Sequence, residues 1–212
     1  MRFAKEYLEL YAVTPSVFSF DKAIWDKVEQ ALAGGVTALQ LREKVLKGEA
    51  LLDVARRLRK LCTAYHVPLI INDSPELALA CKADGVHLGQ DDPALQSART
   101  LLGKSVFIGI SAHSVSEART AERAGADYLG LGAAFPTATK TDVSVLAGGA
   151  LAEIAASVAI PSVAIGGITQ KNIPALAGTG IAGVAVVTAL FDADDVKAAA
   201  QNMRIRIQKQ LF

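Results

Sequence analysis

The most informative stretch of the sequence is Pro68-Leu69-Ile70-Ile71-Asn72-Asp73, a short apolar run that ends in an amide and a carboxylate. Apolar and β-branched residues over this length predict a buried strand, and Pro68 can open it because the first residue of a strand needs no ladder donor. A charge directly after a buried strand is costly unless it faces a site. We therefore expect Asn72 and Asp73 to stand at the rim of a functional site.

The same pattern of an apolar run followed by polar groups recurs elsewhere in the chain. It is found in residues 38–44, 85–92 and 107–113. Because parallel strands that alternate with helices present their carboxyl ends on one side of the fold, these polar groups are expected to share one rim.

Strand-like and helix-like runs alternate along the whole sequence. The expected strands cover residues 8–13, 38–42, 68–72, 85–88, 106–110, 128–131, 162–165 and 183–187. The expected helices cover residues 21–33, 48–65, 74–82, 93–102, 114–124, 146–158, 170–178 and 194–210. A weak internal echo at 33–38, 82–87, 124–129 and 179–184 marks four tight turns into a strand. Eight units predict a single-domain (β/α)8 TIM barrel over residues 1–212, with an open doubly wound sheet as the alternative.

Composition narrows the function classes. A formal net charge of +1 gives no argument for a nucleic-acid partner or an anionic membrane. Cys62 and Cys81 are too few for a disulfide framework and indicate buried thiols in a reducing compartment. The sequence shows no apolar leader region and no uninterrupted apolar span of roughly 18 residues, so we expect a cytoplasmic protein. A homo-oligomer is compatible with the sequence.

An anion site is expected where the last two strands end. Gly166-Gly167 follows the seventh strand, and glycines allow backbone N–H groups to approach phosphate oxygens closely. A tight turn without ligand is the alternative reading of this pair. Arg42, Lys44 and Lys140 follow other strands, and three cations on one rim suit a polyanion such as pyrophosphate. Ordinary solvated surface charge is the alternative for them.

Two carboxylates complete this set. Asp73 and Asp92 follow neighbouring strands, and carboxylates that face cations make sense if Mg²⁺ lies between them and a diphosphate. Asp91 could replace Asp92 as a ligand, and helix N-capping is the alternative role. His87 alternates with apolar residues, which favours a hydrogen-bonded core imidazole. His113 stands near Ser111, but the sequence offers neither a third triad member nor a G-x-S-x-G pattern, which disfavours hydrolase chemistry.

The ordered motifs give the chain a resemblance to the thiamine-phosphate synthase family, also called thiamine-phosphate pyrophosphorylase. The motifs are Gln40-Leu41-Arg42-Glu43-Lys44, Asn72-Asp73, residues 84–92, Ser111-Ala112-His113, residues 135–140 and Ile165-Gly166-Gly167-Ile168. The match runs from Leu10-Tyr11-Ala12-Val13-Thr14-Pro15 to the final helix, so it covers nearly the whole chain, and the motifs stand at the ends of expected strands.

The resemblance implies that hydroxymethylpyrimidine diphosphate and hydroxyethylthiazole phosphate are joined into thiamine phosphate and pyrophosphate, with Mg²⁺ as cofactor. Asp73 and Asp92 would bind the metal. The pyrimidine diphosphate would be held by Gln40, Leu41, Arg42, Glu43, Lys44, Asn72, Ser111 and Lys140. The thiazole phosphate would be held by Thr137, Ala138, Thr139, Gly167, Val187 and Thr188. The catalytic residues would be Arg42, Lys44, Ser111 and Lys140.

The chain departs from the family pattern at three places. Pro15 stands where the family usually has Asp, Ala133-Ala134 replaces a Gly-Pro type pair, and Thr188 replaces Ser. Two other functions remain open. One is the related thiazole tautomerase, for which His113 would be the acid–base residue. The other is a non-catalytic regulator that binds thiamine phosphates.

Overall fold

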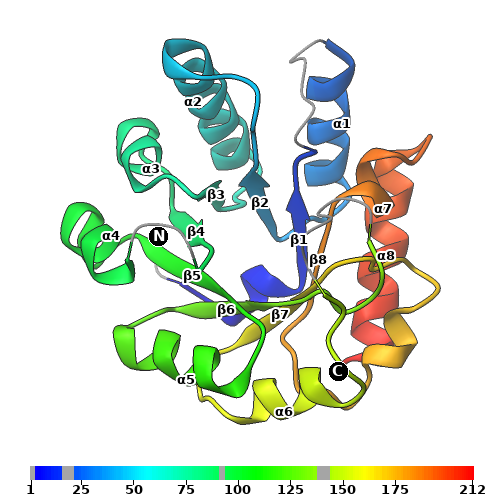
Figure 1. Ribbon diagram of the computed structural model, residues 1–212. Coiled ribbons are helices and arrows are strands. Elements are labelled where there is room, and N and C mark those ends of the chain that lie inside the picture. The colour runs from blue at the N-terminus through cyan, green and yellow to red at the C-terminus, as the bar shows by residue number, and fades with distance from the viewer. Residues whose placement is uncertain (1–2, 16–21, 91–93, 138–143) are drawn as a thin grey trace.

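The computed structural model describes residues 3–15, 22–90, 94–137 and 144–212. Within them, eight parallel strands close into a barrel in chain order, and helices surround it (Figure 1). The strands are β1 Leu10–Val13, β2 Ala38–Leu41, β3 Leu69–Asn72, β4 Gly85–Leu88, β5 Phe107–Ala112, β6 Tyr128–Leu131, β7 Ser162–Ile165 and β8 Val184–Val186. The (β/α)8 TIM barrel expected from the sequence is therefore confirmed.

The outer layer contains both α-helices and short 3₁₀ turns. The α-helices are α1 Lys22–Ala33, α2 Gly48–Ala64, α3 Pro75–Cys81, α4 Leu95–Leu102, α5 Val115–Ala124, α6 Ala150–Ala156, α7 Thr188–Phe191 and α8 Val196–Gln210. The 3₁₀ turns are η1 Lys5–Leu8 and η2 Ile173–Leu176. Expected helix starts at 21 and 93 lie outside the described residues. None of the helices in the described ranges is both long and apolar enough to cross a membrane.

Several expected boundaries differ from the observed ones by one or two residues, and three differences are more informative. Leu8 belongs to η1 and not to β1. α6 begins at Ala150 and not at residue 146, since Gly149 takes a left-handed conformation just before it. The helix expected over 170–178 is only the short η2. There the Asn172 side chain accepts from the Thr169 N–H at 2.8 Å and donates to the Gly167 carbonyl at 2.9 Å, so a turn replaces the first helical residues.

Buried apolar side chains form two separate layers. Inside the barrel, Tyr11, Phe107 and Tyr128 pack with smaller residues, and Phe3 and Tyr7 cover them from the amino-terminal side. The Phe3 and Tyr128 rings stack with centroids 5.7 Å apart. The alternate strand residues pack outward against the helices. This alternation decides which side chains can reach the interior of the barrel.

A repeated contact fixes the amino ends of the strands. The residue directly before β2, β4 or β6 accepts a hydrogen bond from a backbone N–H at the start of the preceding strand. The pairs are Leu10 N with Thr37 Oγ1 at 2.9 Å, Leu69 N with Asp84 Oδ2 at 2.9 Å, and Ile108 N with Asp127 Oδ2 at 2.7 Å. We call these three contacts the amino-end latches. They lie within three of the four echoes seen in the sequence.

Candidate active site

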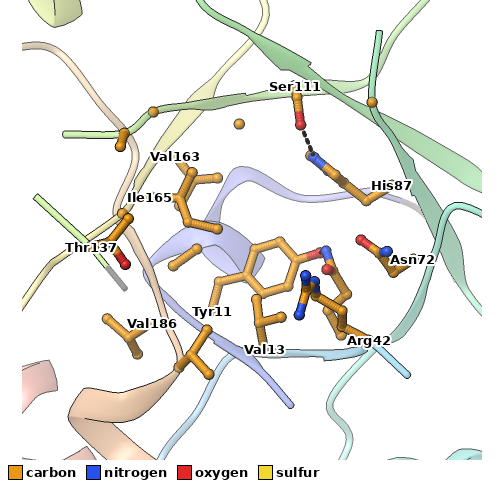
Figure 2. A pocket seen from close by; sticks show the side chains of 18 of the residues that line it. Tyr11, Val13, Arg42, Asn72, His87, Ser111, Thr137, Val163, Ile165 and Val186 are labelled. Atoms are coloured by element: carbon orange, nitrogen blue, oxygen red, sulfur yellow. Dashed lines mark hydrogen bonds between the residues drawn. The ribbon is translucent and has the colours of Figure 1, made fainter. Parts of the chain in front are cut away.

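The site is a pocket of about 400 Å³ at the carboxyl ends of the strands. Figure 2 shows Arg42, Asn72 and His87 on one side of it and Thr137 and Ile165 on the other. The residues expected from the sequence that line the pocket are Gln40, Arg42, Lys44, Asn72, Asp73, Ser111, Thr137, Gly167, Val187 and Thr188. The volume falls in the range of small-molecule sites. Ten of the sixteen site residues expected from the sequence therefore meet in one pocket.

Strand alternation separates the residues that follow β2. Gln40 and Arg42 face the pocket. Leu41 is buried in the layer between strands and helices, and Glu43 turns away to accept hydrogen bonds from the backbone N–H groups of Val45 and Leu46. Leu41 and Glu43 therefore do not line the pocket, although the resemblance places them in the substrate-binding segment.

Arg42 is prepared for a ligand. Its backbone N–H donates to Thr14 Oγ1 at 2.9 Å, and that hydroxyl donates back to the Arg42 carbonyl at 3.1 Å, which fixes the end of β2 against β1. Within the described part of the chain, its buried Nη1 has no hydrogen-bond partner. Buried polar groups are nearly always paired, so an anion in the pocket is the natural partner for this guanidinium.

Asp73 and Lys44 meet at the rim of the pocket. The Lys44 Nζ lies 2.7 Å from Asp73 Oδ2. Asp73 has a φ of 63°, and its backbone N–H donates to the His87 carbonyl at 2.9 Å, which extends the β3–β4 pairing by one residue. This left-handed backbone bends the chain directly after β3, and it places the carboxylate beside the pocket instead of in the next helix.

The donor chemistry around Asp73 fits Mg²⁺. The ion prefers one or two carboxylates, with water and substrate phosphates filling the other positions. A carboxylate at the mouth, partly exposed and paired with the Lys44 ammonium, offers such an incomplete set. In the described ranges no group of three or more His, Cys, Asp and Glu side chains forms a self-sufficient metal cage. The expected second ligand, Asp92, and its alternative, Asp91, lie outside those ranges.

The double glycine after β7 serves close contact between two loops. Gly166 and Gly167 have φ of 101° and 62°. A Cβ on Gly166 would lie 2.7 Å from Ala133, and one on Gly167 would collide with the Pro136 carbonyl oxygen. The two glycines therefore do form a tight turn, as the alternative interpretation expected. The pair also leaves backbone exposed in the pocket, as an anion site requires.

The opposite wall comes from the end of β8. Val187 and Thr188 line the pocket where the chain enters α7, and Thr137, which follows β6, lies on the same side as Val186 (Figure 2). Three further residues expected here, Ala138, Thr139 and Lys140, lie outside the described residues.

The two central histidines have different surroundings. His113 stands on the rim, and its Nδ1 lies 3.2 Å from Glu117 Oε2, which also accepts from the His113 backbone N–H at 2.8 Å. Ser114 caps α5 by accepting from the Glu117 N–H. His87 has both ring nitrogens within 3.0 Å of hydroxyl oxygens, which confirms the expected hydrogen-bonded imidazole.

Sequence reasoning missed a buried chain of polar groups below the pocket. Tyr11 and Tyr128 project inward from β1 and β6, and their hydroxyl oxygens lie 3.0 Å apart. Burial is the main cause that raises the pKa of each hydroxyl well above its ordinary value, so both stay protonated at neutral pH. Their even spacing from inward-facing Val13 and Gly130 was the available signal, since alternate strand residues share a face.

The sequence of this chain also matches that of a known protein family. A model of the family described as thiamine monophosphate synthase matches residues 10–190. The chain belongs to the thiamine monophosphate synthase family.

Individual relatives agree with this membership. A thiamine-phosphate synthase from Clostridium botulinum (strain 657) is 46% identical over 198 residues, which are 93% of this chain and 97% of the relative. One from Clostridium novyi is 44% identical over 196 residues, covering 92% and 96%. The thiamine phosphate pyrophosphorylase structure from Pyrococcus furiosus superposes with a TM-score of 0.89 at 36% identity, covering 98% of this chain and 99% of that one.

One departure from the synthase family pattern now has a structural context. Ala133 is buried, and its backbone N–H and carbonyl pair with Ser144 and Leu146. Its methyl group lies where the absent Cβ of Gly166 would point. A small residue at this position therefore lets the loops after β6 and β7 pack together. Nothing in the structure explains Pro15 in place of Asp.

Proposed function

We propose that this chain transfers the pyrimidinylmethyl group of hydroxymethylpyrimidine diphosphate to the nitrogen of hydroxyethylthiazole phosphate, giving thiamine phosphate and pyrophosphate with Mg²⁺ as cofactor. One observation carries the proposal beyond family membership. The buried Arg42 Nη1, which has no hydrogen-bond partner among the described residues, shares one pocket with Lys44, Asp73 and the Gly167 backbone. That arrangement offers separate places for a diphosphate and for a second phosphate.

The main catalytic requirement of this reaction is stabilisation of the charge that develops on the leaving diphosphate. The methylene C–O bond breaks, and its electron pair leaves with the diphosphate. The thiazole nitrogen then donates its lone pair to the methylene carbon and becomes positively charged. Arg42 and Lys44 would stabilise the negative charge that grows on the departing diphosphate, because preformed charges cost little reorganisation when the reaction occurs. Bound Mg²⁺ would add a Lewis acid to the same oxygens.

Positioning supplies the remaining contribution. Under this proposal the two phosphates would bind at opposite walls of the pocket, near Arg42 and near Thr137, which would align the thiazole nitrogen with the methylene carbon. Bringing two reactants into contact in one orientation can contribute a large part of an enzyme's acceleration. No protein nucleophile is required, in keeping with the lack of a triad pattern in the sequence.

Two other activities have weaker support. A thiazole tautomerase needs a free acid–base group, whereas His113 contacts Glu117 through its ring and its backbone. A non-catalytic regulator needs no cation set arranged around a leaving group. We also propose a cytoplasmic location, because both cysteines are buried free thiols, as is usual in a reducing compartment.

Turnover tests the proposal directly. The purified protein, mixed with both substrates and Mg²⁺, is expected to release thiamine phosphate and pyrophosphate in equal amounts, measured by chromatography and a coupled phosphate assay. Leaving out either substrate or the metal should abolish both products. Tight binding of thiamine phosphate without turnover would instead support the regulator, and isomerisation of a thiazole without pyrophosphate release would support the tautomerase.

A further inference from the structure

A continuous line of hydrogen bonds runs from the wall of the barrel through its interior to Ser111 at the mouth. Gln40 Nε2 donates to Tyr11 Oη at 2.8 Å, and Tyr11 Oη lies 3.0 Å from Tyr128 Oη. Tyr128 Oη lies 3.0 Å from His87 Nδ1, and His87 Nε2 lies 3.0 Å from Ser111 Oγ (Figure 2). Side chains from four strands, β1, β2, β4 and β6, are thus connected by hydrogen bonds to Ser111 on β5.

The amide of Gln40 gives this line a direction. An amide NH₂ group can only donate, so Tyr11 Oη accepts from it. Among the described hydrogen bonds, the Tyr128 oxygen is the acceptor available to the buried Tyr11 hydrogen, which would otherwise be left unpaired. The Tyr128 oxygen accepts that hydrogen and gives its own to His87 Nδ1. A ring nitrogen that accepts carries no hydrogen, so the neutral imidazole bears its hydrogen on Nε2 and donates it to Ser111 Oγ. The Ser111 hydroxyl hydrogen then remains for an acceptor in the pocket.

Both tyrosine hydroxyls are protonated and can donate a hydrogen bond. Burial keeps their pKa values above the ordinary range, so each hydroxyl holds one hydrogen at neutral pH. The two rings are also fully enclosed, with Tyr11 1% exposed and Tyr128 0% exposed. Water therefore has little access with which to reverse the order of donors and acceptors.

Two glycines on the inner face make room for the rings of this line. A Cβ on Gly109 would collide with the Tyr128 ring, and one on Gly130 would lie 2.9 Å from His87 Cε1. Neither glycine has a positive φ, so neither is needed for its backbone conformation. The two positions are open space for aromatic rings at the level of the line, which indicates a built arrangement and not an incidental contact.

We propose that Gln40, Tyr11 and Tyr128 are positioning residues that hold His87 in its Nε2–H form, so that the Ser111 hydroxyl donates to an acceptor oxygen of the pyrimidine diphosphate. The identity of that acceptor rests on the proposed function, whereas the state of His87 is a property of the free protein. A hydroxyl that already accepts from an imidazole points its hydrogen in a narrow range of directions. It would therefore bind the diphosphate without first reorienting.

The direction can be read from the imidazole nitrogens of the whole protein. In ¹⁵N-labelled protein without substrate, long-range proton–nitrogen spectra distinguish a nitrogen that carries hydrogen from one that accepts. Only three histidines contribute signals, and the His87→Gln variant identifies those of His87. The expected spectrum has hydrogen on Nε2 and none on Nδ1. Hydrogen on Nδ1, alone or together with Nε2, would overturn the proposal without affecting the proposed function.

A matched pair of variants links this state to activity. Tyr128→Phe removes the donor to Nδ1 and is expected to give a mixture of the two tautomers, with kcat about tenfold lower and KM for the thiazole phosphate unchanged. Tyr7→Phe makes the same change beside Phe107, outside the hydrogen-bonded line, and should leave both readouts as in wild type. A Tyr128→Phe protein with the wild-type tautomer, or with an unchanged kcat, would also overturn the proposal. If Tyr128→Phe does not fold, the wild-type spectrum still decides.

Discussion

Lys44 Nζ lies 2.7 Å from Asp73 Oδ2, although the two residues leave different strands, β2 and β3. In the absence of ligand each charge neutralises the other at the mouth of the pocket. Both are partly exposed, so their attraction contributes little to the stability of the fold. Under the proposed function, the two groups would separate when Mg²⁺ binds the carboxylate and the diphosphate binds the ammonium.

Asp73→Asn tests the metal assignment. The substitution keeps the shape and removes one negative charge from the proposed ion site, so the Mg²⁺-dependent rate is expected to fall by about 100-fold. Initial rates over a range of Mg²⁺ concentrations measure the effect. Asp53→Asn, an exposed carboxylate on α2, is the matched control and should change nothing. A wild-type rate at limiting Mg²⁺ would contradict the role of Asp73.

Arg42→Lys tests whether the Arg42 Nη1, which has no partner in the described ranges, binds the diphosphate. Lysine keeps the charge but cannot present two parallel N–H groups, so the Kd for inorganic pyrophosphate with Mg²⁺ should rise by roughly 10- to 100-fold. Titration calorimetry measures it. Arg56→Lys on the exposed face of α2 provides the comparison. An unchanged Kd in the Arg42 variant would place the diphosphate elsewhere.

Gly167→Ala tests the backbone wall on the thiazole side. The new methyl group would collide with the Pro136 carbonyl and also require a left-handed alanine, so the loops after β6 and β7 must separate. We expect KM for the thiazole phosphate to rise by about tenfold or more, with pyrophosphate affinity preserved.

Gly178→Ala separates backbone strain from collision. Gly178 also has a positive φ, 75°, but nothing lies within 4 Å of the position of its Cβ. Its variant should lose some stability in thermal unfolding and keep the wild-type KM. Equal KM values in the two variants would show that the Gly167 wall does not contact substrate.

Asp84→Ala tests the amino-end latches. The carboxylate is almost fully buried, accepts from the Leu69 N–H and pairs with Arg59 at 3.1 Å. Its loss leaves a buried donor unsatisfied, so the free energy of unfolding should fall by about 3 kcal/mol while kcat is unchanged, because the latch lies at the end of the barrel opposite the pocket. Urea unfolding measures the effect. Asp84→Asn keeps an acceptor and should lose less. If both variants lost the same free energy of unfolding, the effect would come from the ion pair with Arg59 and not from the bond to the Leu69 N–H.

Sequence reasoning succeeded where a local pattern has one structural solution. Strands β4, β6 and β7 have the expected bounds because apolar runs end at glycine or charge, and their number implied a closed barrel. It failed where side chains override local propensity. Asn172 replaces the start of a helix with a turn, and Pro174 offers no N–H for helical pairing.

The same limit applies to the site. Rim residues such as Arg42 and Asn72 could be identified because they stand at strand ends. The line from Tyr11 to Ser111 could not, since its members come from distant parts of the sequence and meet only when the barrel closes. Tyr11 and Tyr128, for instance, are 117 residues apart in the chain.

The amino-end latches join the strands two by two, β1 with β2, β3 with β4, and β5 with β6. In a circular permutant whose new termini lie after β2, the two residues of each latch would remain close in sequence. New termini between α3 and β4 would separate Leu69 and Asp84, now 15 residues apart, by almost the whole chain. Their contact would then form slowly, because it would have to close a long loop. The barrel is thus expected to accept circular permutation between these pairs and to resist it within them.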